Sequence, residues 1–299
     1  MSISSVFLHK AAQVFGFPRI VKRAIFHPPR GMGAVSERMF VRHADVLRQD
    51  VDGSMLLTVR PYRGSGNHIF FLHGGAYAIE AFSPHRYIIK YFLKNGFSVT
   101  FFDYPLVPEH TAKHIHEAVF KAYKITTAAF ADDTFFLFGD SAGGALSLSL
   151  LQRVLDDAYT CRPYKTAVIS APVDATGGHP DIAEYSKKER ILPVDALISL
   201  ADIYAGELPL SHPVISPTYG RLHGLGSLLL CYSNCEVFFP DNDTFFRKLE
   251  GAEGTYPKKY IGENLMHDWI VAPIPERRQT LGMICDFFAE DCVKEFDSV

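Results

Sequence analysis

A serine lies in a short glycine-rich stretch between two apolar runs. Residues 139–143 have the sequence Gly-Asp-Ser-Ala-Gly, after the strand-like run 134–138 and before the helix-like run 145–151. Gly-x-Ser-x-Gly at a strand-to-helix turn is typical of a nucleophile elbow, in which a strained turn exposes the serine hydroxyl. The flanking glycines have no Cβ, so the strand and helix backbones can approach closely. The spacing predicts that Ser141 is a nucleophile for acyl transfer, although a Gly/Ser turn is also ordinary helix-capping chemistry.

A second apolar run, residues 69–72, ends in His73 and the pair Gly74-Gly75. Acyl transfer places negative charge on the carbonyl oxygen of the substrate, and backbone N–H groups aimed at that oxygen need a loop with little side-chain bulk. Gly74 and Gly75 can each present an N–H group, and the residue after the nucleophile, Ala142, supplies another. We therefore predict an oxyanion hole built from these three residues.

These segments resemble the hormone-sensitive lipase-like branch of the α/β-hydrolases, which includes many bacterial carboxylesterases. The likeness extends to Asp-Tyr-Pro-Leu-Val-Pro-Glu-His at 103–110, Ser-Ala-Pro-Val-Asp at 170–174 and Ser-Pro at 216–217. One departure is Ala76, where the family usually has a third glycine. Ala76 keeps its N–H group but has less freedom in φ, so the loop is expected to use its two glycines only.

A serine hydroxyl needs a base to accept its proton and an acid to orient that base. In this fold the chain order is serine, acid, histidine, so the base follows Ser141. The histidines that do so are His179, His212, His223 and His267. His267 lies in a loop between a strand-like stretch and a predicted helix, where the family carries its catalytic histidine. The resemblance therefore assigns His267 as the base and leaves His73 to hold the oxyanion loop.

The acid is expected near the end of a strand predicted over residues 226–233. Three carboxylates lie within reach of that end, Glu236, Asp241 and Asp243. Related sequences place an acid at the strand end, an apolar residue two positions later and further acids that open the next helix. This arrangement favours Glu236, with Phe238 as the apolar residue, and Asp241 remains the alternative. Asp241 and Asp243 would then cap free N–H groups of the helix.

The composition is that of a globular enzyme and disfavours several other classes. The chain has 299 residues, 47% hydrophobic and 21% charged, enough to bury the core of one α/β domain over residues 1–299. A net charge of −3 argues against nucleic-acid binding, and the short apolar runs argue against stable membrane insertion. No spacing of histidines or cysteines suggests a metal site, and the expected chemistry requires no cofactor.

The location is expected to be cytoplasmic. The N-terminus has no basic start followed by a long apolar stretch, as an export signal would have. The cysteines form no disulfide framework and are expected to be free thiols in a reducing compartment. They are Cys161, Cys231, Cys235, Cys285 and Cys292.

Strand-like and helix-like segments alternate along the chain, which predicts a mostly parallel eight-stranded sheet with helices on both faces. An edge hairpin is expected from residues 39–47 and 55–61, joined around residues 52–54. The other strands are expected near 68–73, 98–104, 134–138, 165–171, 226–233 and 255–261, and the helices near 83–95, 110–130, 142–157, 241–250 and 275–296. This is the α/β-hydrolase fold that the resemblance implies.

Two stretches fit no element of the sheet and are expected to form a helical cap, about 1–35 and 175–211. The first carries a helical apolar stripe of Val6, Phe7, Ala11, Val14 and Phe15. The second contains predicted helices at 181–188 and 193–204. Insertions at the carboxyl ends of strands tend to shape the substrate pocket. The expected pocket residues are Phe15, Tyr77, Leu192, Leu197 and Tyr204.

The residues and the resemblance together predict a serine carboxylesterase that hydrolyses short- to medium-chain esters through an acyl-enzyme intermediate. The partner is a small-molecule ester, and the family admits a homo-oligomer. An amidase or peptidase would use the same triad. A lipase would favour a broad apolar lid, whereas this cap carries charges at Lys187, Lys188, Glu189 and Arg190. A non-catalytic binding relative is the fourth hypothesis, and such relatives are expected to have lost a triad residue.

Overall fold

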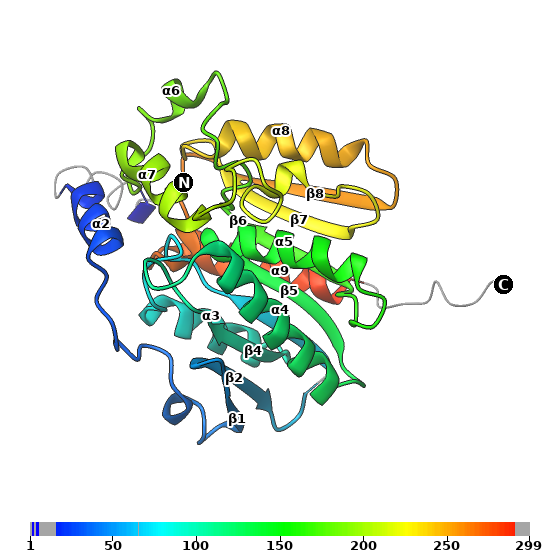
Figure 1. Cartoon of the computed structure of the whole chain (residues 1–299). Coiled ribbons are helices and arrows are strands. Elements are labelled where there is room, and N and C mark those ends of the chain that lie inside the picture. The colour runs from blue at the N-terminus through cyan, green and yellow to red at the C-terminus, as the bar shows by residue number, and fades with distance from the viewer. Residues whose placement is uncertain (1, 3, 6–15, 65, 291–299) are drawn as a thin grey trace.

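The computed structural model describes residues 2, 4–5, 16–64 and 66–290, and its centre is an eight-stranded sheet (Figure 1). The strands are β1 (Ala44–Val51), β2 (Ser54–Pro61), β3 (Asn67–Leu72), β4 (Ser98–Asp103), β5 (Thr134–Asp140), β6 (Lys165–Ile169), β7 (Gly226–Ser233) and β8 (Thr255–Gly262). Their order is β1-β2-β4-β3-β5-β6-β7-β8. β2 is antiparallel to both neighbours, and the strands from β4 to β8 pair in parallel. The expected fold, a mostly parallel sheet of eight strands, is confirmed.

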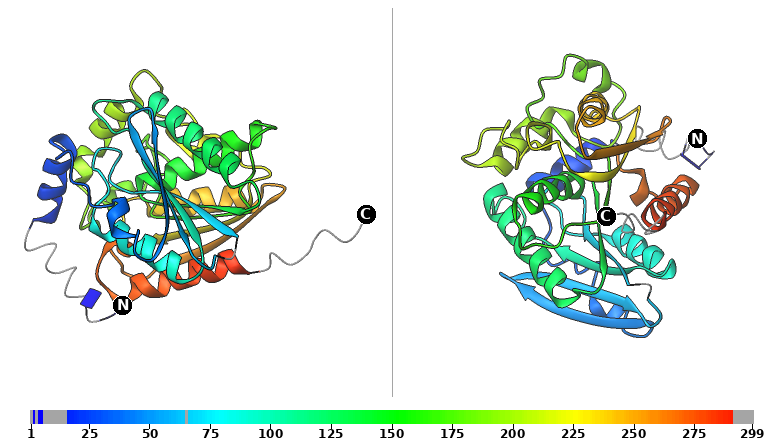
Figure 2. Two further views of the ribbon diagram at one scale, coloured as in Figure 1. Left: turned by 90° about the horizontal axis from the view of Figure 1, so that it is seen from below. Right: turned by 90° about the vertical axis from the view of Figure 1, so that its right-hand side faces the viewer.

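Helices cover both faces of the sheet (Figure 2). They are α2 (Phe17–Phe26), α3 (Ser83–Lys94), α4 (Ala112–Ala129), α5 (Ala142–Asp156), α6 (Ile182–Tyr185), α7 (Val194–Ala205), α8 (Phe239–Glu250) and α9 (Pro275–Ala289), with 3₁₀ turns η1 (Glu37–Met39), η2 (Pro217–Tyr219) and η3 (Trp269–Val271). Because successive strand residues point to opposite faces, Phe70 and Leu72 join the core under α4, α5 and α8. Ile69 and Phe71 join the core under α3 and α9.

The edge hairpin forms, but its first strand is displaced along the chain from its expected place at 39–47. Residues 37–39 form the η1 turn, and β1 continues to Val51. Asp52 and Gly53 both have positive φ, 54° and 83°, which is the backbone of a two-residue hairpin turn. Because the turn consists of these two residues only, β1 extends to the residue directly before them.

α9 ends at Ala289, and residues 291–296 of the expected helix 275–296 lie outside the described residues. The ammonium group of Lys165 donates hydrogen bonds to the carbonyl oxygens of Phe287 and Glu290. A cation that binds the last carbonyls of a helix stabilises its end. The sequence pattern of α9 does not reveal this cap, since Lys165 comes from β6.

The helices outside the sheet layers gather at the end of the sheet where the parallel strands finish (Figure 1). α6 and α7 belong to the inserted segment, residues 175–211, which joins β6 to β7. α6 is shorter than the expected 181–188, and α7 matches the expected 193–204 within one residue at each end. α2 lies beside α7, and Lys22 forms an ion pair with Asp195. The apolar stripe expected between residues 6 and 15 lies outside the described residues.

Candidate active site

Ser141 lies at the turn between β5 and α5, where the backbone is strained. Its φ and ψ are 48° and −120°, a conformation that L-residues seldom adopt. A Cβ on Gly139 would lie less than 3.0 Å from the carbonyl of Gly143. A Cβ on Gly143 would meet the carbonyl of Leu72 in β3 just as closely. Both glycines are therefore required for the close approach that the sequence pattern predicts.

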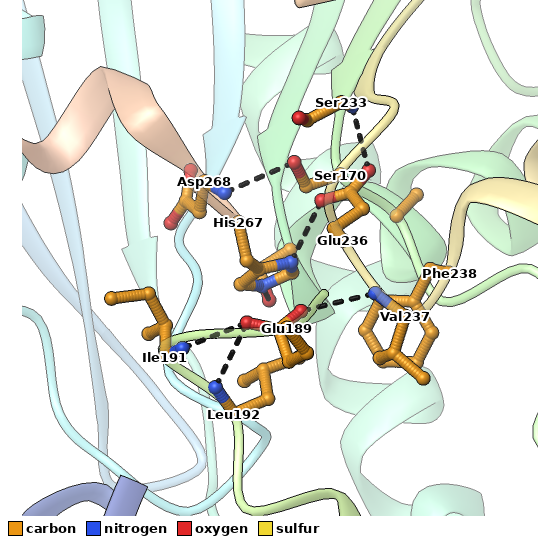
Figure 3. Close-up of polar contacts among 12 residues, drawn as sticks. Ser170, Glu189, Ile191, Leu192, Ser233, Glu236, Val237, Phe238, His267 and Asp268 are labelled. Atoms are coloured by element: carbon orange, nitrogen blue, oxygen red, sulfur yellow. Dashed lines mark hydrogen bonds and ion pairs between the residues drawn. The ribbon is translucent and has the colours of Figure 1, made fainter. Parts of the chain in front are cut away.

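The structure brings Ser141, His267 and Glu236 into one chain of hydrogen bonds. The Oγ atom of Ser141 is 2.9 Å from Nε2 of His267, and Nδ1 of His267 is 2.9 Å from Oε2 of Glu236. The other carboxylate oxygen of Glu236 accepts the N–H of Ser233 at 3.1 Å (Figure 3). Glu236 is fully buried and His267 is 4% exposed, so water competes little for these bonds.

The electrostatic surroundings favour a charged imidazole at His267. Burial disfavours the charge, but the hydrogen bond and negative charge of Glu236 outweigh it, so the pKa of His267 is raised. The charges of Glu189 and Asp140 act in the same direction. The site can therefore stabilise the imidazolium that forms when a base takes a proton from a serine.

The loop after β3 passes next to Ser141. A Cβ on Gly74 would lie 3.2 Å from Cβ of Ser141, and Gly75 has a φ of 132°. Ala76 has a φ of 56°, so it adopts the left-handed backbone that the family's third glycine would favour. Ala76 therefore accepts a strained backbone at this place in the loop.

His73 lies behind this loop and is fully buried. Its Nδ1 donates to the carbonyl of Gly74 at 2.6 Å, and its Nε2 is 3.2 Å from a carboxylate oxygen of Asp103. The hydroxyl of Tyr104 donates to the carbonyl of His73 at 2.7 Å, and the two rings stack. These contacts fix the loop from its inner side.

A buried polar network next to the elbow was not anticipated from the sequence. Nε2 of His85 is 3.1 Å from a carboxylate oxygen of Asp140, and this contact holds the pKa of Asp140 low in spite of burial. Burial and the nearby charge of Asp140 raise the pKa of Asp268 well above its usual value. A sequence signal existed, because both acids adjoin predicted site residues, Ser141 and His267.

Two cavities meet at Ser141. The smaller, of about 150 Å³, has walls from the inserted segment and from the stacked rings of Tyr77 and Tyr204, 3.7 Å apart. The larger, of about 730 Å³, is lined by apolar residues of α2 and by Met266 and His267. Among the expected pocket residues, Tyr77, Leu192, Leu197 and Tyr204 line the smaller cavity, and Phe15 lies outside the described residues.

A family model described as the alpha/beta hydrolase fold matches residues 69–271, more than half of the chain. The chain belongs to the α/β-hydrolase family. The hydrolase is 26% identical to an esterase of Acinetobacter venetianus over 223 residues, 73% of each protein. It is 30% identical to an acetyl-hydrolase of Streptomyces hygroscopicus over 185 residues, 61% of this chain and 62% of that protein. An esterase from the bacterial hormone-sensitive lipase family superposes with a TM-score of 0.76 at 23% identity, over 93% of this chain and 97% of the other. The α/β-hydrolase family that the resemblance implies is confirmed.

The alternative acid, Asp241, occupies a different place in the hydrolase. It lies in the first turn of α8 and lines the smaller cavity, whereas His267 is hydrogen-bonded to Glu236. Burial and the charge of Asp174 raise the pKa of Asp241 to about 7. Its neighbour Asp243 forms ion pairs with Lys259 and Arg247.

Glu189 is one of the four consecutive charged residues at 187–190 of the cap, but its side chain is buried. Lys187 is exposed, but Glu189 is only 8% exposed and faces the site. Its carboxylate accepts hydrogen bonds from four backbone N–H groups. Backbone donors leave no mark in a sequence, so nothing in the residue pattern distinguishes Glu189 from its exposed neighbours.

In the described part of the hydrolase, no group of three or more histidine, cysteine, aspartate or glutamate side chains is placed to hold a metal ion. Within the same residues, no helix is both long enough and apolar enough to cross a bilayer. The described cysteines are free thiols, and Cys292 lies outside the described residues.

Proposed function

We propose that the hydrolase is a serine carboxylesterase that cleaves short- to medium-chain esters through an acyl-enzyme intermediate. The observation that carries the proposal is the hydrogen-bonded chain from Ser141 through His267 to Glu236, placed where two cavities meet. Similar proteins bear the names esterase and acetyl-hydrolase, which supports the same reaction class.

In the first step, Oγ of Ser141 attacks the ester carbonyl carbon while Nε2 of His267 takes the hydroxyl proton. Glu236 holds the imidazole in the tautomer that accepts this proton and stabilises the imidazolium. The developing oxyanion is bound by the N–H groups of Gly74, Gly75 and Ala142. One such donor typically lowers the barrier by about 3 kcal/mol. The tetrahedral intermediate then collapses, and the alcohol leaves with the proton from His267.

The second step releases the acid. Water gives a proton to Nε2 of His267 and attacks the acyl carbon, and a second tetrahedral intermediate forms against the same N–H groups. As this intermediate breaks down, His267 returns the proton to Oγ of Ser141. The products are one carboxylic acid and one alcohol, and the triad ends in its starting state.

The two cavities differ in size, which supports binding of the shorter part of an ester in one and of the longer part in the other. A cavity of about 150 Å³ is the size that takes one benzene molecule, about six heavy atoms. The larger cavity has apolar walls from Phe17, Ile20 and Ile79, which suit the hydrocarbon of the longer part. We therefore expect turnover to fall once both parts of an ester exceed the smaller cavity.

The test is hydrolysis of p-nitrophenyl esters from acetate to laurate by the wild type, Ser141→Ala and Ser149→Ala. Ser149 is a matched control on α5, where its hydroxyl contacts the carbonyl of Pro213. We expect a short-chain optimum that is lost in Ser141→Ala and kept in Ser149→Ala. Absence of wild-type turnover on every ester would contradict the proposal. Parallel assays with p-nitroanilides and emulsified triacylglycerols would reveal an amidase or a lipase instead.

We further propose a cytoplasmic location and a homo-oligomer. The location is supported by the free thiols of the described cysteines, which suit a reducing compartment. A homo-oligomer through a sheet edge or α9 is consistent with the family, and size-exclusion chromatography with light scattering tests it directly.

A further inference from the structure

The carboxylate of Glu189 is bound by four backbone N–H groups. Oε1 accepts those of Arg190 and Ile191 at 2.8 Å each and that of Leu192 at 3.2 Å. Oε2 accepts the N–H of Val237 at 3.0 Å. Figure 3 shows the carboxylate between the inserted segment and the loop that carries Glu236. One buried side chain therefore ties these two parts of the chain together.

The loop held in this way contains the triad acid and a neighbour of the base. Val237 follows Glu236 directly, so the bond to its N–H limits how far the acid can move away from the imidazole. The next ring, Phe238, packs edge-on against His267 with ring centres 5.5 Å apart. At the other end of the link, Leu192 lines both cavities beside Ser141. The link thus joins the triad to the pocket wall.

The charge of Glu189 also acts on the base. Three carboxylates raise the pKa of His267, namely Glu236 from the loop after β7, Glu189 from the inserted segment and Asp140 from the end of β5. Asp268 follows His267 in the chain, and burial with the charge of Asp140 raises its pKa, which disfavours its charged form. A fixed negative charge in a site shielded from water stabilises a cation that forms during the reaction.

We propose that Glu189 is a positioning residue of the active site, which holds the acid loop and pocket wall in register and stabilises the imidazolium of His267 by its charge. The proposal rests on the esterase function proposed above. It assigns to the inserted segment a part in the chemical step, in addition to its part in enclosing the substrate.

The test compares three variants with the wild type on p-nitrophenyl butyrate. Glu189→Gln keeps the shape, but it removes the charge and turns an amide N–H toward the N–H of Val237. Glu189→Asp keeps the charge and shortens the reach. Glu184→Gln is the matched control, because Glu184 is an exposed residue of the same segment, paired only with Lys188 in the described residues.

For Glu189→Gln we expect kcat to fall about tenfold with KM within about twofold, a change of about 1.4 kcal/mol in the barrier. Loss of a charge that raises the pKa of the base also moves the acid limb of the kcat/KM profile to lower pH. Glu189→Asp should keep the wild-type acid limb although its kcat falls, and Glu184→Gln should match the wild type in both. A lower melting temperature with unchanged kcat and pH profile would overturn the proposal.

An NMR titration separates this inference from the esterase proposal. The imidazole resonances of His267 can be followed with pH in the wild type and in Glu189→Gln, without any substrate. A lower pKa in Glu189→Gln supports the effect of Glu189 on the base even if no ester is turned over. An identical titration in both proteins would overturn the inference and leave the esterase proposal standing.

Discussion

The two sides of the active site are held in different ways. On the sheet side, the elbow and the loop after β3 depend on backbone contacts that leave no room for a Cβ at Gly139, Gly143 or Gly75. On the side of the inserted segment, a single buried carboxylate, Glu189, binds four N–H groups. The sheet side is fixed by steric exclusion, and the other side is fixed by one replaceable side chain.

This difference affects which amino-acid substitutions each side of the site tolerates. A glycine packed against a carbonyl tolerates no larger residue without movement of the backbone. A carboxylate link can be weakened stepwise by substitution, and the segment that it holds carries much of the smaller cavity wall. We infer that substrate range can be altered in the inserted segment while the elbow stays constant.

The largest difference in activity is expected between variants of Glu236 and Asp241, the two residues that the sequence offers as the triad acid. Glu236→Gln should lower kcat about 10³- to 10⁴-fold, because an amide no longer holds the reactive tautomer of His267. Asp241→Asn should stay within about threefold of the wild type, since Asp241 lines the cavity away from that hydrogen bond. Initial rates with p-nitrophenyl butyrate measure both. A large loss in Asp241→Asn with a small one in Glu236→Gln would reverse the assignment.

The steric basis of the sheet side is tested by Gly143→Ala. Its Cβ would lie less than 3.0 Å from the carbonyl of Leu72, which is part of a central strand and cannot move away. We expect unfolding in urea to show a loss of about 3 kcal/mol or more, or no folded protein. Gly251→Ala is the control, with its nearest atom 3.8 Å away, and should change stability by less than about 1 kcal/mol. Equal stability of both variants would show that the close approach of residue 143 to Leu72 does not require a glycine.

The smallest effect concerns the pH dependence of stability at α8. Burial and Asp174 raise the pKa of Asp241 to about 7. The folded state then keeps a proton that the unfolded chain has lost, so stability falls as pH rises from about 4 through 7. Asp241→Asn should therefore melt about 2–6 °C higher than the wild type at pH 8 and equally at pH 4.

Asp243 on the same helix provides a control with the opposite sign. Lys259 and Arg247 hold its pKa low in spite of partial burial. Its stabilising effect is present at neutral pH and is lost as pH falls through the lowered pKa. Asp243→Asn should melt below the wild type at pH 8. A rise in melting temperature at pH 8 for both variants would contradict the different environments assigned to the two acids.

The sheet side could be predicted from the sequence because its constraints act on residue types. Glycines at 139, 143, 74 and 75 and apolar runs of strand length mark the elbow and the loop directly. The left-handed Ala76 could not be foreseen, since the chain accepts local strain where the surrounding contacts determine the loop.

The inserted segment was harder to predict, because its contacts run through groups that every residue possesses. The sequence shows Glu189 as one charge in a run of four, and nothing marks it as the buried one. The network of Asp140, His85 and Asp268 is likewise assembled from three distant parts of the chain. Long-range side-chain pairing of this kind becomes visible only in three dimensions.

Labelling with diethyl p-nitrophenyl phosphate tests whether Ser141 forms the covalent intermediate. This reagent phosphorylates an activated serine and releases p-nitrophenol, and mass spectrometry of peptides locates the label. We predict one label per chain, on the peptide that contains Ser141, with loss of esterase activity in proportion, and no label in Ser141→Ala. Inactivation with the label on another residue, or full activity in Ser141→Ala, would contradict this role of Ser141.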